Sequence, residues 1–278
     1  MITPAQLKGQ LKNLAIKHNV SVQFLLQKYM QERLLCRIAK STYADKFVLK
    51  GGFLVSVMTG IDQRTTMDVD ATVKDFPLSQ TRVADIFVEI LSIPCDDQVS
   101  FTLDTMEDIR ENDVYSGLRL KFSALYPPLK VPLKMDLTTG DSIYPHTCQL
   151  DIVPMFSDEN IQLTAYCIEN VLAEKLETIL SRGNQNTRPR DFYDVWLLTK
   201  HTQQKISYDT LKIALRNTME HRGTGHILPD AISILEYIAK SHEMREYWRR
   251  YQQSYSYASE CIFEETLEAV KELLRKLQ

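Results

Sequence analysis

The chain has 278 residues, of which 44% are hydrophobic and 25% charged, a composition typical of a globular protein with one large domain or two modest ones. A formal net charge of -3 and an isoelectric point near 6.1 exclude a surface coated in positive charge, so any contact with nucleic acid must come from a local patch. Five scattered cysteines without a CxxC pair suggest neither a disulfide framework nor a zinc site, and together with the lack of a membrane-spanning run or signal peptide they favour the cytoplasm and no membrane partner.

The first forty residues predict two helices. Leu7, Leu11 and Leu14 recur at helical spacing, and Ser21 is a candidate cap for the second helix, VQFLLQKYMQERLLCRIAK. From Phe47 to about Leu137 the pattern changes to short alternating segments, with one helix at residues 82–91 between them.

Three of these segments predict strands that bury one face and show a charged one, because side chains on a strand alternate between faces. They are TMDVDATV (66–73), GLRLKFSA (117–124) and VPLKMDLT (131–138). The charged residues on their polar faces are Asp68, Asp70, Arg119, Lys121, Lys134 and Asp136. If the three strands pair in one antiparallel sheet, the three acids lie close together with the three cations around them.

Clustered carboxylates repel one another unless a cation lies between them. Oxygen ligands at positions i and i+2, with a third from a neighbouring strand, suit Mg²⁺, which takes its remaining ligands from water and substrate phosphates. Such ions stabilise the attacking and leaving oxygens of a phosphoryl or nucleotidyl transfer. The alternative interpretation is that the acids are solvated strand residues with ordinary salt bridges.

Gly51 and Gly52 follow the apolar triplet at residues 47–49 and precede FLVSVM, a candidate short buried helix. A strand, a tight glycine turn and a helix start together expose backbone N–H groups that can hold a phosphate. A plain turn is the alternative.

From Tyr166 the chain is predicted to be helical almost to its end. Helices are expected at residues 168–182, 189–200, 207–220, 229–253 and 262–277. The sequence therefore predicts an α+β fold, with an amino-terminal domain of mixed or antiparallel sheet and flanking helices (1–160) and an all-helical carboxy-terminal domain (161–278).

A helical wheel of ENVLAEKLETILSR predicts three arcs. The core arc holds Leu172, Leu176, Ile179 and Leu180. The opposite arc, expected in solvent, holds Asn170, Glu174, Glu177 and Ser181. The third arc, beside the core, holds Lys175, Thr178 and Arg182, which suits a triphosphate unless it is a solvated flank.

The next segment, RPRDFYDVWLLTKH, is apolar nearly all round, yet it contains Asp191 and Asp194. Acids on a buried helix are costly unless they are paired. The candidate partners are Arg188, Arg190, Lys175 and Arg182. A purely structural ion-pair network is the alternative to a catalytic role.

A basic segment near the carboxyl end is a candidate RNA-binding surface. Its cations are Lys240, His242, Arg245, Arg249 and Arg250, and they alternate with Tyr247, Trp248 and Tyr251. Cations offer phosphate contacts and aromatic rings offer stacking surfaces. A solvated amphipathic helix end is the alternative.

The order LKGG, RTTMDVD, LKMD, ENVLAEKLETILSR and RPRDFYDV over residues 46–198 resembles the AbiEii family of nucleotidyltransferase-like toxins from abortive-infection and type IV toxin–antitoxin systems. The resemblance implies a DNA polymerase β-like nucleotidyltransferase fold with a helical carboxy-terminal domain. It also implies Mg²⁺- or Mn²⁺-dependent use of a nucleoside triphosphate, addition of nucleotides to tRNA 3′ ends, and a cognate antitoxin.

Residue by residue, the resemblance makes Asp68 and Asp70 the metal ligands and Asp136 the third acid of the site. Lys175 corresponds to the essential lysine of the family, and Asp191 or Asp194 to its late catalytic acid. The residues assigned to nucleotide binding are Gly51, Gly52, Arg64, Thr66, Lys175, Thr178 and Arg182.

The leading hypothesis is a metal-dependent nucleotidyltransferase toxin that acts in anti-phage defence. Two alternatives are nucleotidyl transfer to a small molecule or a protein hydroxyl, and a catalytically lapsed protein that works by binding a partner.

Overall fold

The computed structural model describes residues 2–109, 117–200 and 206–277. The chain forms two compact units. The first, here the β unit, comprises Met1–Val57, Thr65–Gly140 and Cys148–Ala165. The second, the helical unit, comprises Met58–Arg64, Asp141–Thr147 and Tyr166–Gln278.

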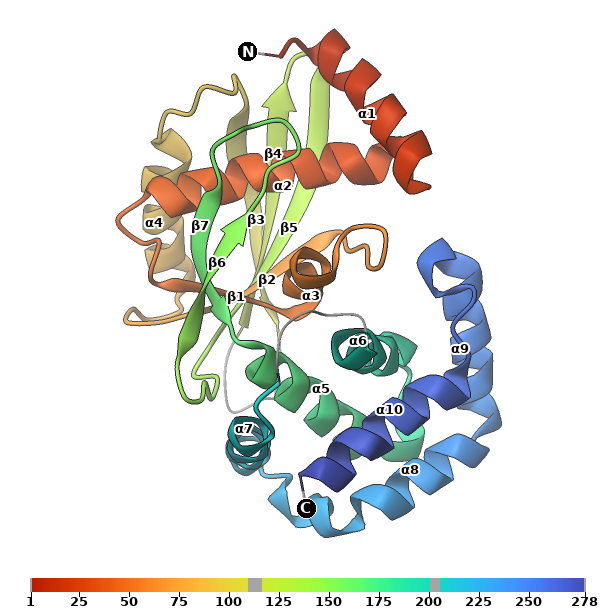
Figure 1. Cartoon of the computed structure of the whole chain (residues 1–278). Coiled ribbons are helices and arrows are strands. Elements are labelled where there is room, and N and C mark those ends of the chain that lie inside the picture. Colours follow the sequence, from red (N-terminus) through yellow and green to blue (C-terminus); the bar gives the residue numbers. More distant parts are fainter. Residues whose placement is uncertain (1, 110–116, 201–205, 278) are drawn as a thin grey trace. The chain divides into compact units, whose positions relative to one another are not determined.

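A seven-stranded sheet is the centre of the β unit, with strand order β3-β4-β5-β2-β1-β7-β6 (Figure 1). The strands are β1(Phe47–Lys50), β2(Asp68–Val73), β3(Ser100–Ile109), β4(Gly117–Tyr126), β5(Leu129–Thr139), β6(Thr147–Ile152) and β7(Ile161–Tyr166). The sheet is mixed: β4 runs antiparallel to β3 and β5, and β1 to β2, whereas β2 is parallel to β5. The predicted α+β class is confirmed, and the expected antiparallel pairing is wrong for β2 and β5.

Four helices begin in the β unit: α1(Pro4–His18), α2(Val22–Lys40), α3(Gly51–Thr59) and α4(Gln80–Ser92). The predicted cap is confirmed, because the Ser21 hydroxyl accepts a hydrogen bond from the backbone N–H of Phe24 at 3.0 Å. α2 lies across the strands and packs on β5 and α4, and α4 packs on β3 (Figure 1).

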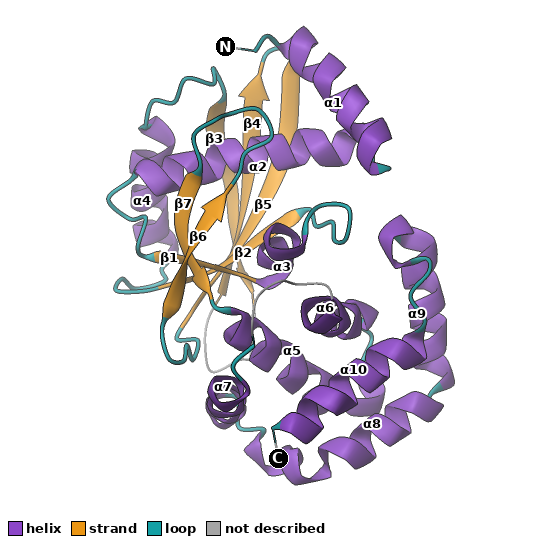
Figure 2. Cartoon of the chain, viewed as in Figure 1, coloured by secondary structure: helices purple, strands orange, loops and turns teal. Residues whose placement is uncertain are grey.

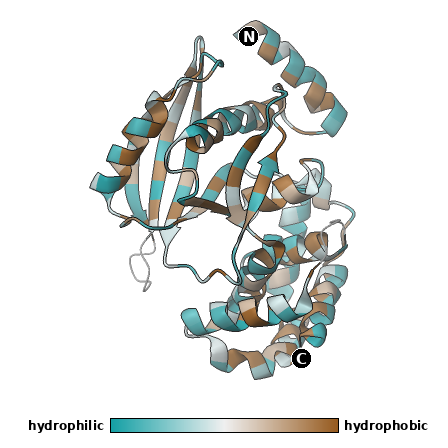
Figure 3. Ribbon diagram, turned by 60° about the vertical axis from the view of Figure 1, so that its left-hand side comes forward, coloured by the Kyte–Doolittle hydropathy of each residue, from teal (hydrophilic) through white to brown (hydrophobic). Residues whose placement is uncertain are grey.

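Hydrophobic and hydrophilic residues alternate along the strands (Figure 3). Val69, Ala71 and Val73 of β2 are buried, as the alternation predicts, and so are Leu118 to Ala124 and Val131 to Leu137 at every second position. Met67 is the exception: it precedes β2 and is 40% exposed, so it does not belong to the buried face.

The segment after β7 is built from helices and loops (Figure 2). Its helices are α5(Ile168–Arg182), α6(Pro189–Lys200), α7(Tyr208–His221), α8(Ala231–Lys240), α9(His242–Ser254) and α10(Phe263–Lys276), with short turns η1(Gly183–Gln185), η2(Gly225–Asp230) and η3(Ser256–Ala258). The single helix predicted at 229–253 is wrong. Ser241 has an extended backbone that ends α8, and its hydroxyl accepts from Met244 N–H to start α9.

Within the described ranges, no helix combines the length and the apolar character that crossing a membrane requires.

Candidate active site

Three carboxylates share one face of the sheet in the β unit. Asp68 and Asp70 lie at the start of β2, and the parallel register places Asp70 directly opposite Asp136 of β5. Asp68 lies opposite Lys134 in the same register. Because Asp68 and Asp70 are two residues apart, both point away from buried Val69, so the polar face predicted from alternation is present.

Asp136 is neutralised by a neighbour on the adjacent strand. Arg119 of β4 lies directly opposite Asp136, and its Nε and terminal nitrogen donate to the two carboxylate oxygens at 2.8 and 2.7 Å. These hydrogen bonds and the carboxylate charge raise the pKa of Arg119 above its usual value. Lys121, the other cation of β4, pairs instead with Glu107 of β3.

Asp68 is left with an unsatisfied oxygen. Its Oδ1 is buried and has no hydrogen-bond partner among the described residues, and the nearest cation, Lys134 Nζ, is 3.4 Å away. An anionic oxygen shielded from water without a donor is costly unless a cation approaches it. Asp68, Asp70 and Asp136 offer hard oxygen ligands, so the residues present fit Mg²⁺ or Mn²⁺, with Arg119 as a competitor for Asp136.

Gly51 allows the chain to pass close to Asp70. β1 ends at Lys50 and α3 begins at Gly51, which confirms the predicted strand, glycine turn and helix. Gly51 has φ +66°, and a Cβ at this position would lie 2.2 Å from Asp70 Oδ2. Both the backbone conformation and the space therefore require glycine here. Asp68, Asp70 and Asp136 are called the acid row below. Thr66, two residues before Asp68, is half-buried, and its hydroxyl lies 3.5 Å from the carbonyl oxygen of Asp68.

Two buried glutamines hold the residue before Asp68. The Nε2 atoms of Gln27 and Gln31 on α2 both donate to the carbonyl oxygen of Met67 at 2.8 Å. Their spacing of four residues places both amides on one side of the helix. Sequence reasoning missed these residues, because glutamines next to Lys28 and Glu32 look like exposed helix positions.

In the helical unit, Asp191 and Asp194 of α6 are buried in an ion-pair network. Lys175 Nζ of α5 lies 2.8 Å from Asp191 Oδ1 and 2.7 Å from Asp194 Oδ2, and Arg188 Nε lies 3.3 Å from Asp191 Oδ2. Arg64 Nε donates to Asp194 Oδ1 at 2.7 Å. Lys175 and Arg188 were predicted as partners, whereas Arg64 was not.

The charges of this network stabilise one another. Burial by itself would raise the pKa of Asp194, but Arg64 and Lys175 more than offset it, so the pKa lies below its usual value. Burial likewise would lower the pKa of Lys175, and the charges of Asp191 and Asp194 raise it instead. Asp194 and Lys175 are therefore both ionised near neutral pH.

The family model for the AbiEii toxin, described as a nucleotidyl transferase of a type IV toxin–antitoxin system, matches residues 33–275. The chain belongs to the AbiEii nucleotidyltransferase toxin family. Family membership implies a nucleotide substrate and a cognate antitoxin. Of the motifs that carried the resemblance, LKGG, RTTMDVD and LKMD lie at the acid row of the β unit, and ENVLAEKLETILSR and RPRDFYDV supply the Lys175–Asp191–Asp194 network of the helical unit.

Two solved structures from Helicobacter pylori are similar to this AbiEii-family chain. JHP933 is 14% identical with a TM-score of 0.52 and covers 92% of each chain. A candidate nucleotidyltransferase is 15% identical with a TM-score of 0.49, over 93% of this chain and 96% of the other. At this identity JHP933 supports the fold alone. Comparison with curated protein sequences gave no match.

The face of α5 that was expected in solvent is largely buried, so this prediction is wrong. Glu177 is 3% exposed and pairs with Arg222, the residue after α7, which also reaches Glu174 at 3.3 Å. Asn170 is 2% exposed and exchanges two hydrogen bonds with the backbone of Tyr144. The wheel failed because α7 packs on this side of α5 and the residue after it supplies the cation.

The predicted phosphate contacts of α5 and their neighbours have unequal environments. Arg182 is exposed, whereas Thr178 Oγ1 is half-buried and accepts from Arg222 at 3.4 Å. Arg64, also predicted to bind nucleotide, is 5% exposed and held by Asp194. The nucleotide-binding roles of these residues stay predictions.

Two of the three aromatic residues predicted to stack on RNA are buried, and the third, Tyr247, is half-buried. Trp248 and Tyr251 are 4% and 7% exposed and belong to the core of the helical unit, so their expected role is wrong. Arg245 pairs with Glu264, and Arg249 with Glu246. Arg250 is exposed, and the described residues offer it no ion-pair partner.

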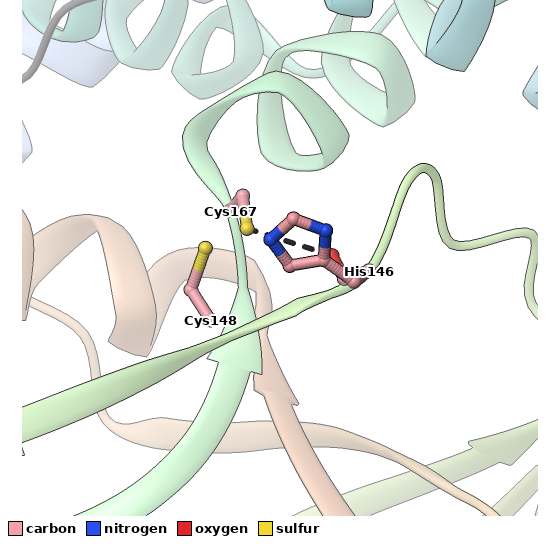
Figure 4. A group of neighbouring side chains, drawn as sticks. All are labelled: His146, Cys148 and Cys167. Atoms are coloured by element: carbon pink, nitrogen blue, oxygen red, sulfur yellow. Dashed lines mark hydrogen bonds between the residues drawn. The ribbon is translucent and has the colours of Figure 1, made fainter.

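A cysteine and the backbone of a histidine are in contact near the start of α5. Cys167 Sγ of the helical unit is 3.5 Å from the carbonyl oxygen of His146 (Figure 4, which also labels Cys148 of the β unit). Imidazole and sulfur ligands suit softer metals than Mg²⁺. The magnesium prediction therefore depends on the acids of the β unit.

Proposed function

We propose that this AbiEii-family protein is a cytoplasmic toxin of anti-phage defence that transfers nucleotides from a nucleoside triphosphate to RNA, at the 3′ end of tRNA, with Mg²⁺ or Mn²⁺. The observation that carries the proposal is the row of three acids on one face of the sheet, in which Asp68 Oδ1 has an ion-pair contact with Lys134 at 3.4 Å but no hydrogen-bond partner among the described residues. Neighbouring carboxylates repel one another unless a cation lies between them.

The acids of the β unit have different roles in this proposal. Asp68 and Asp70 would hold the metal ion, which would neutralise charge on the transferring phosphate when bound. Asp136 would complete the ligand set. Once its ion pair with Arg119 has opened, Asp136 would also accept the proton of the attacking hydroxyl. Gly51 keeps Asp70 in place because a side chain there would displace its carboxylate.

Lys175 would bind a phosphate without leaving its network. An ammonium group has three N–H donors, and Asp191 and Asp194 use two of them. Arg64, Lys175 and Arg188 all lie within 3.3 Å of these two carboxylates, so positive charge gathers around Lys175. Exposed Arg182 and half-buried Thr178 would add a cation and a hydroxyl on the same helix.

For the RNA acceptor, the exposed arginines of α9 are the proposed phosphate contacts. Arg250 is the main proposed phosphate contact, because Arg245 and Arg249 already pair with acids. Arg250→Glu should weaken tRNA binding and reduce its dependence on salt concentration, whereas Lys17→Glu, at an exposed position of α1, should leave both unchanged.

The test of the reaction is label transfer from each of the four α-³²P nucleoside triphosphates to purified tRNA, with Mg²⁺ and with EDTA. Wild type, Asp68→Asn and the control Asp75→Asn should be compared. Asp75 is an exposed acid just after β2 that pairs with Lys46, and its φ of +64° suits asparagine.

The proposal predicts Mg²⁺-dependent labelling by wild type and Asp75→Asn and none by Asp68→Asn. Equal labelling by folded Asp68→Asn would refute the metal assignment. Labelling of a protein or small molecule in place of tRNA would refute the RNA acceptor and keep the transfer chemistry.

A further inference from the structure

The β unit contains a pocket of about 680 Å³ that the proposed reaction does not use. It is lined by α2, by the segment that follows α4 and by residues 154–162. α2 packs on the face of the sheet that carries the apolar side chains of β5, whereas the acid row lies on the polar face. The pocket and the acid row are therefore on opposite faces of the sheet.

Two free thiols meet in the wall of this pocket. Cys36 of α2 and Cys95, after α4, are both half-buried, and both line the pocket. Cys95 Sγ donates to Cys36 Sγ at 3.8 Å. Burial, and the neighbouring Cys36 sulfur, raise the pKa of Cys95 to about 11. Cys95 therefore keeps its proton near neutral pH, and its S–H group can donate to the Cys36 sulfur.

Two cations of α2 lie near Cys36, in a pocket that Asp96, Asp97 and Glu159 also line. Arg33 and Lys40, three residues before and four residues after Cys36, line the same pocket. The side chain of Arg33 is 11% exposed, and its buried Nε has no hydrogen-bond partner among the described residues. Lys40 has a distant partner, Glu159, at 3.9 Å. Positive charge beside a thiol favours the thiolate and attracts carboxylates.

We propose that Cys36 and Cys95 form a reactive dithiol that is oxidised by anionic low-molecular-weight disulfides of the glutathione type, with Arg33 holding a carboxylate of the reagent. Cys36 thiolate attacks one sulfur of the disulfide, forming a mixed disulfide and releasing one glutathione thiolate. Cys95 then loses its proton to water and attacks the Cys36 sulfur, which releases the second glutathione. Two protein thiols are oxidised to one disulfide, and one glutathione disulfide is reduced to two thiols.

The test uses the reduced, purified full chain incubated with oxidised glutathione, alkylated, and mapped by mass spectrometry. Wild type should lose the alkylatable thiols of Cys36 and Cys95 and yield a cross-linked peptide pair that contains both residues. Cys95→Ser should accumulate one glutathionyl group on Cys36, and Cys36→Ser should gain one on Cys95 at least about tenfold more slowly. Cys261→Ser, at a buried cysteine of the helical unit, should behave as wild type.

The role of Arg33 is tested with a neutral reagent. Arg33→Gln should slow oxidation by glutathione disulfide several-fold more than oxidation by bis(2-hydroxyethyl) disulfide. Equal slowing by the two reagents would overturn the anionic class. Retention of both thiols by wild type, or equal rates in Cys36→Ser and Cys95→Ser, would overturn the dithiol. Circular dichroism of each variant establishes that it is folded.

Discussion

The acids of the two units differ in their burial and in the cations around them. In the β unit, Asp68 is half-exposed and has an oxygen without a hydrogen-bond donor. In the helical unit, Asp191 and Asp194 are at most 2% exposed and are surrounded by three cations. Buried carboxylates with cations close to them stabilise a fold, whereas acids that lie together on a half-exposed sheet face suit a metal ion. Under the proposed function, similar residue types therefore stabilise the helical unit and bind a metal ion in the β unit.

The largest effect should come from breaking the buried network. Asp194→Ala leaves Arg64 and Lys175 without their shared partner, so the free energy of unfolding should fall by about 3–5 kcal/mol. Urea denaturation followed by circular dichroism measures this change. The control Glu272→Gln, which removes an exposed partner of Lys200, should leave the midpoint unchanged. Equal midpoints for the two variants would contradict a stabilising role of the network.

A smaller loss should follow from crowding the acid row. Gly51→Ala imposes a left-handed backbone on alanine and pushes a methyl group into Asp70, which should cost about 2 kcal/mol. Gly9→Ala is the matched control, because Gly9 lies within α1 and a Cβ there meets nothing within 4 Å. This control should be neutral or stabilising by up to about 1 kcal/mol. If both substitutions had the same effect on the free energy of unfolding, Gly51 would be an ordinary turn residue.

Removing Arg119, which competes for Asp136, should make Asp68, Asp70 and Asp136 bind a metal ion more tightly. Arg119→Gln frees both oxygens of Asp136, so Mg²⁺ should bind a few-fold more tightly in isothermal titration calorimetry. Lys121→Gln, two residues along the same strand, removes a cation that pairs with Glu107 and should not change the affinity. Weaker Mg²⁺ binding by Arg119→Gln would show that Asp136 is not a ligand.

The smallest effect concerns the pH dependence of stability. The folded-state pKa of Asp194 lies below its unfolded value, so this carboxylate contributes its full stabilisation above about pH 4. The contribution is lost as the pH falls through the folded-state pKa, because the unfolded chain then binds the additional proton. Between about pH 4 and pH 2 the free energy of unfolding should decrease more steeply for wild type than for Asp194→Asn. Parallel curves would contradict the ionised state of Asp194.

The sequence predicts the acid row well because alternation along a strand is a local property. Asp68, Asp70 and Asp136 share a face whether β2 and β5 run parallel or antiparallel. The prediction of the acid row was therefore correct although the predicted strand direction was wrong. Local patterns also located the start of α2 at Ser21 and the glycine turn at Gly51.

Long-range partners could not be predicted from local patterns. The partnership of Arg64 with Asp194 spans 130 residues, and that of Arg222 with Glu177 spans 45. A helical wheel describes one helix alone, so it placed Glu177 in solvent although α7 covers that face. The buried positions of Trp248 and Tyr251 in α9 were missed for the same reason.

The most direct test of the account is a Mn²⁺ titration followed by the electron paramagnetic resonance signal of the free ion, with wild type, Asp68→Asn and Asp75→Asn. The account predicts that wild type and Asp75→Asn bind Mn²⁺ with the same Kd, and that Asp68→Asn binds at least about tenfold more weakly. Equal binding by all three proteins would contradict the claim that Asp68, Asp70 and Asp136 of the β unit form a metal site.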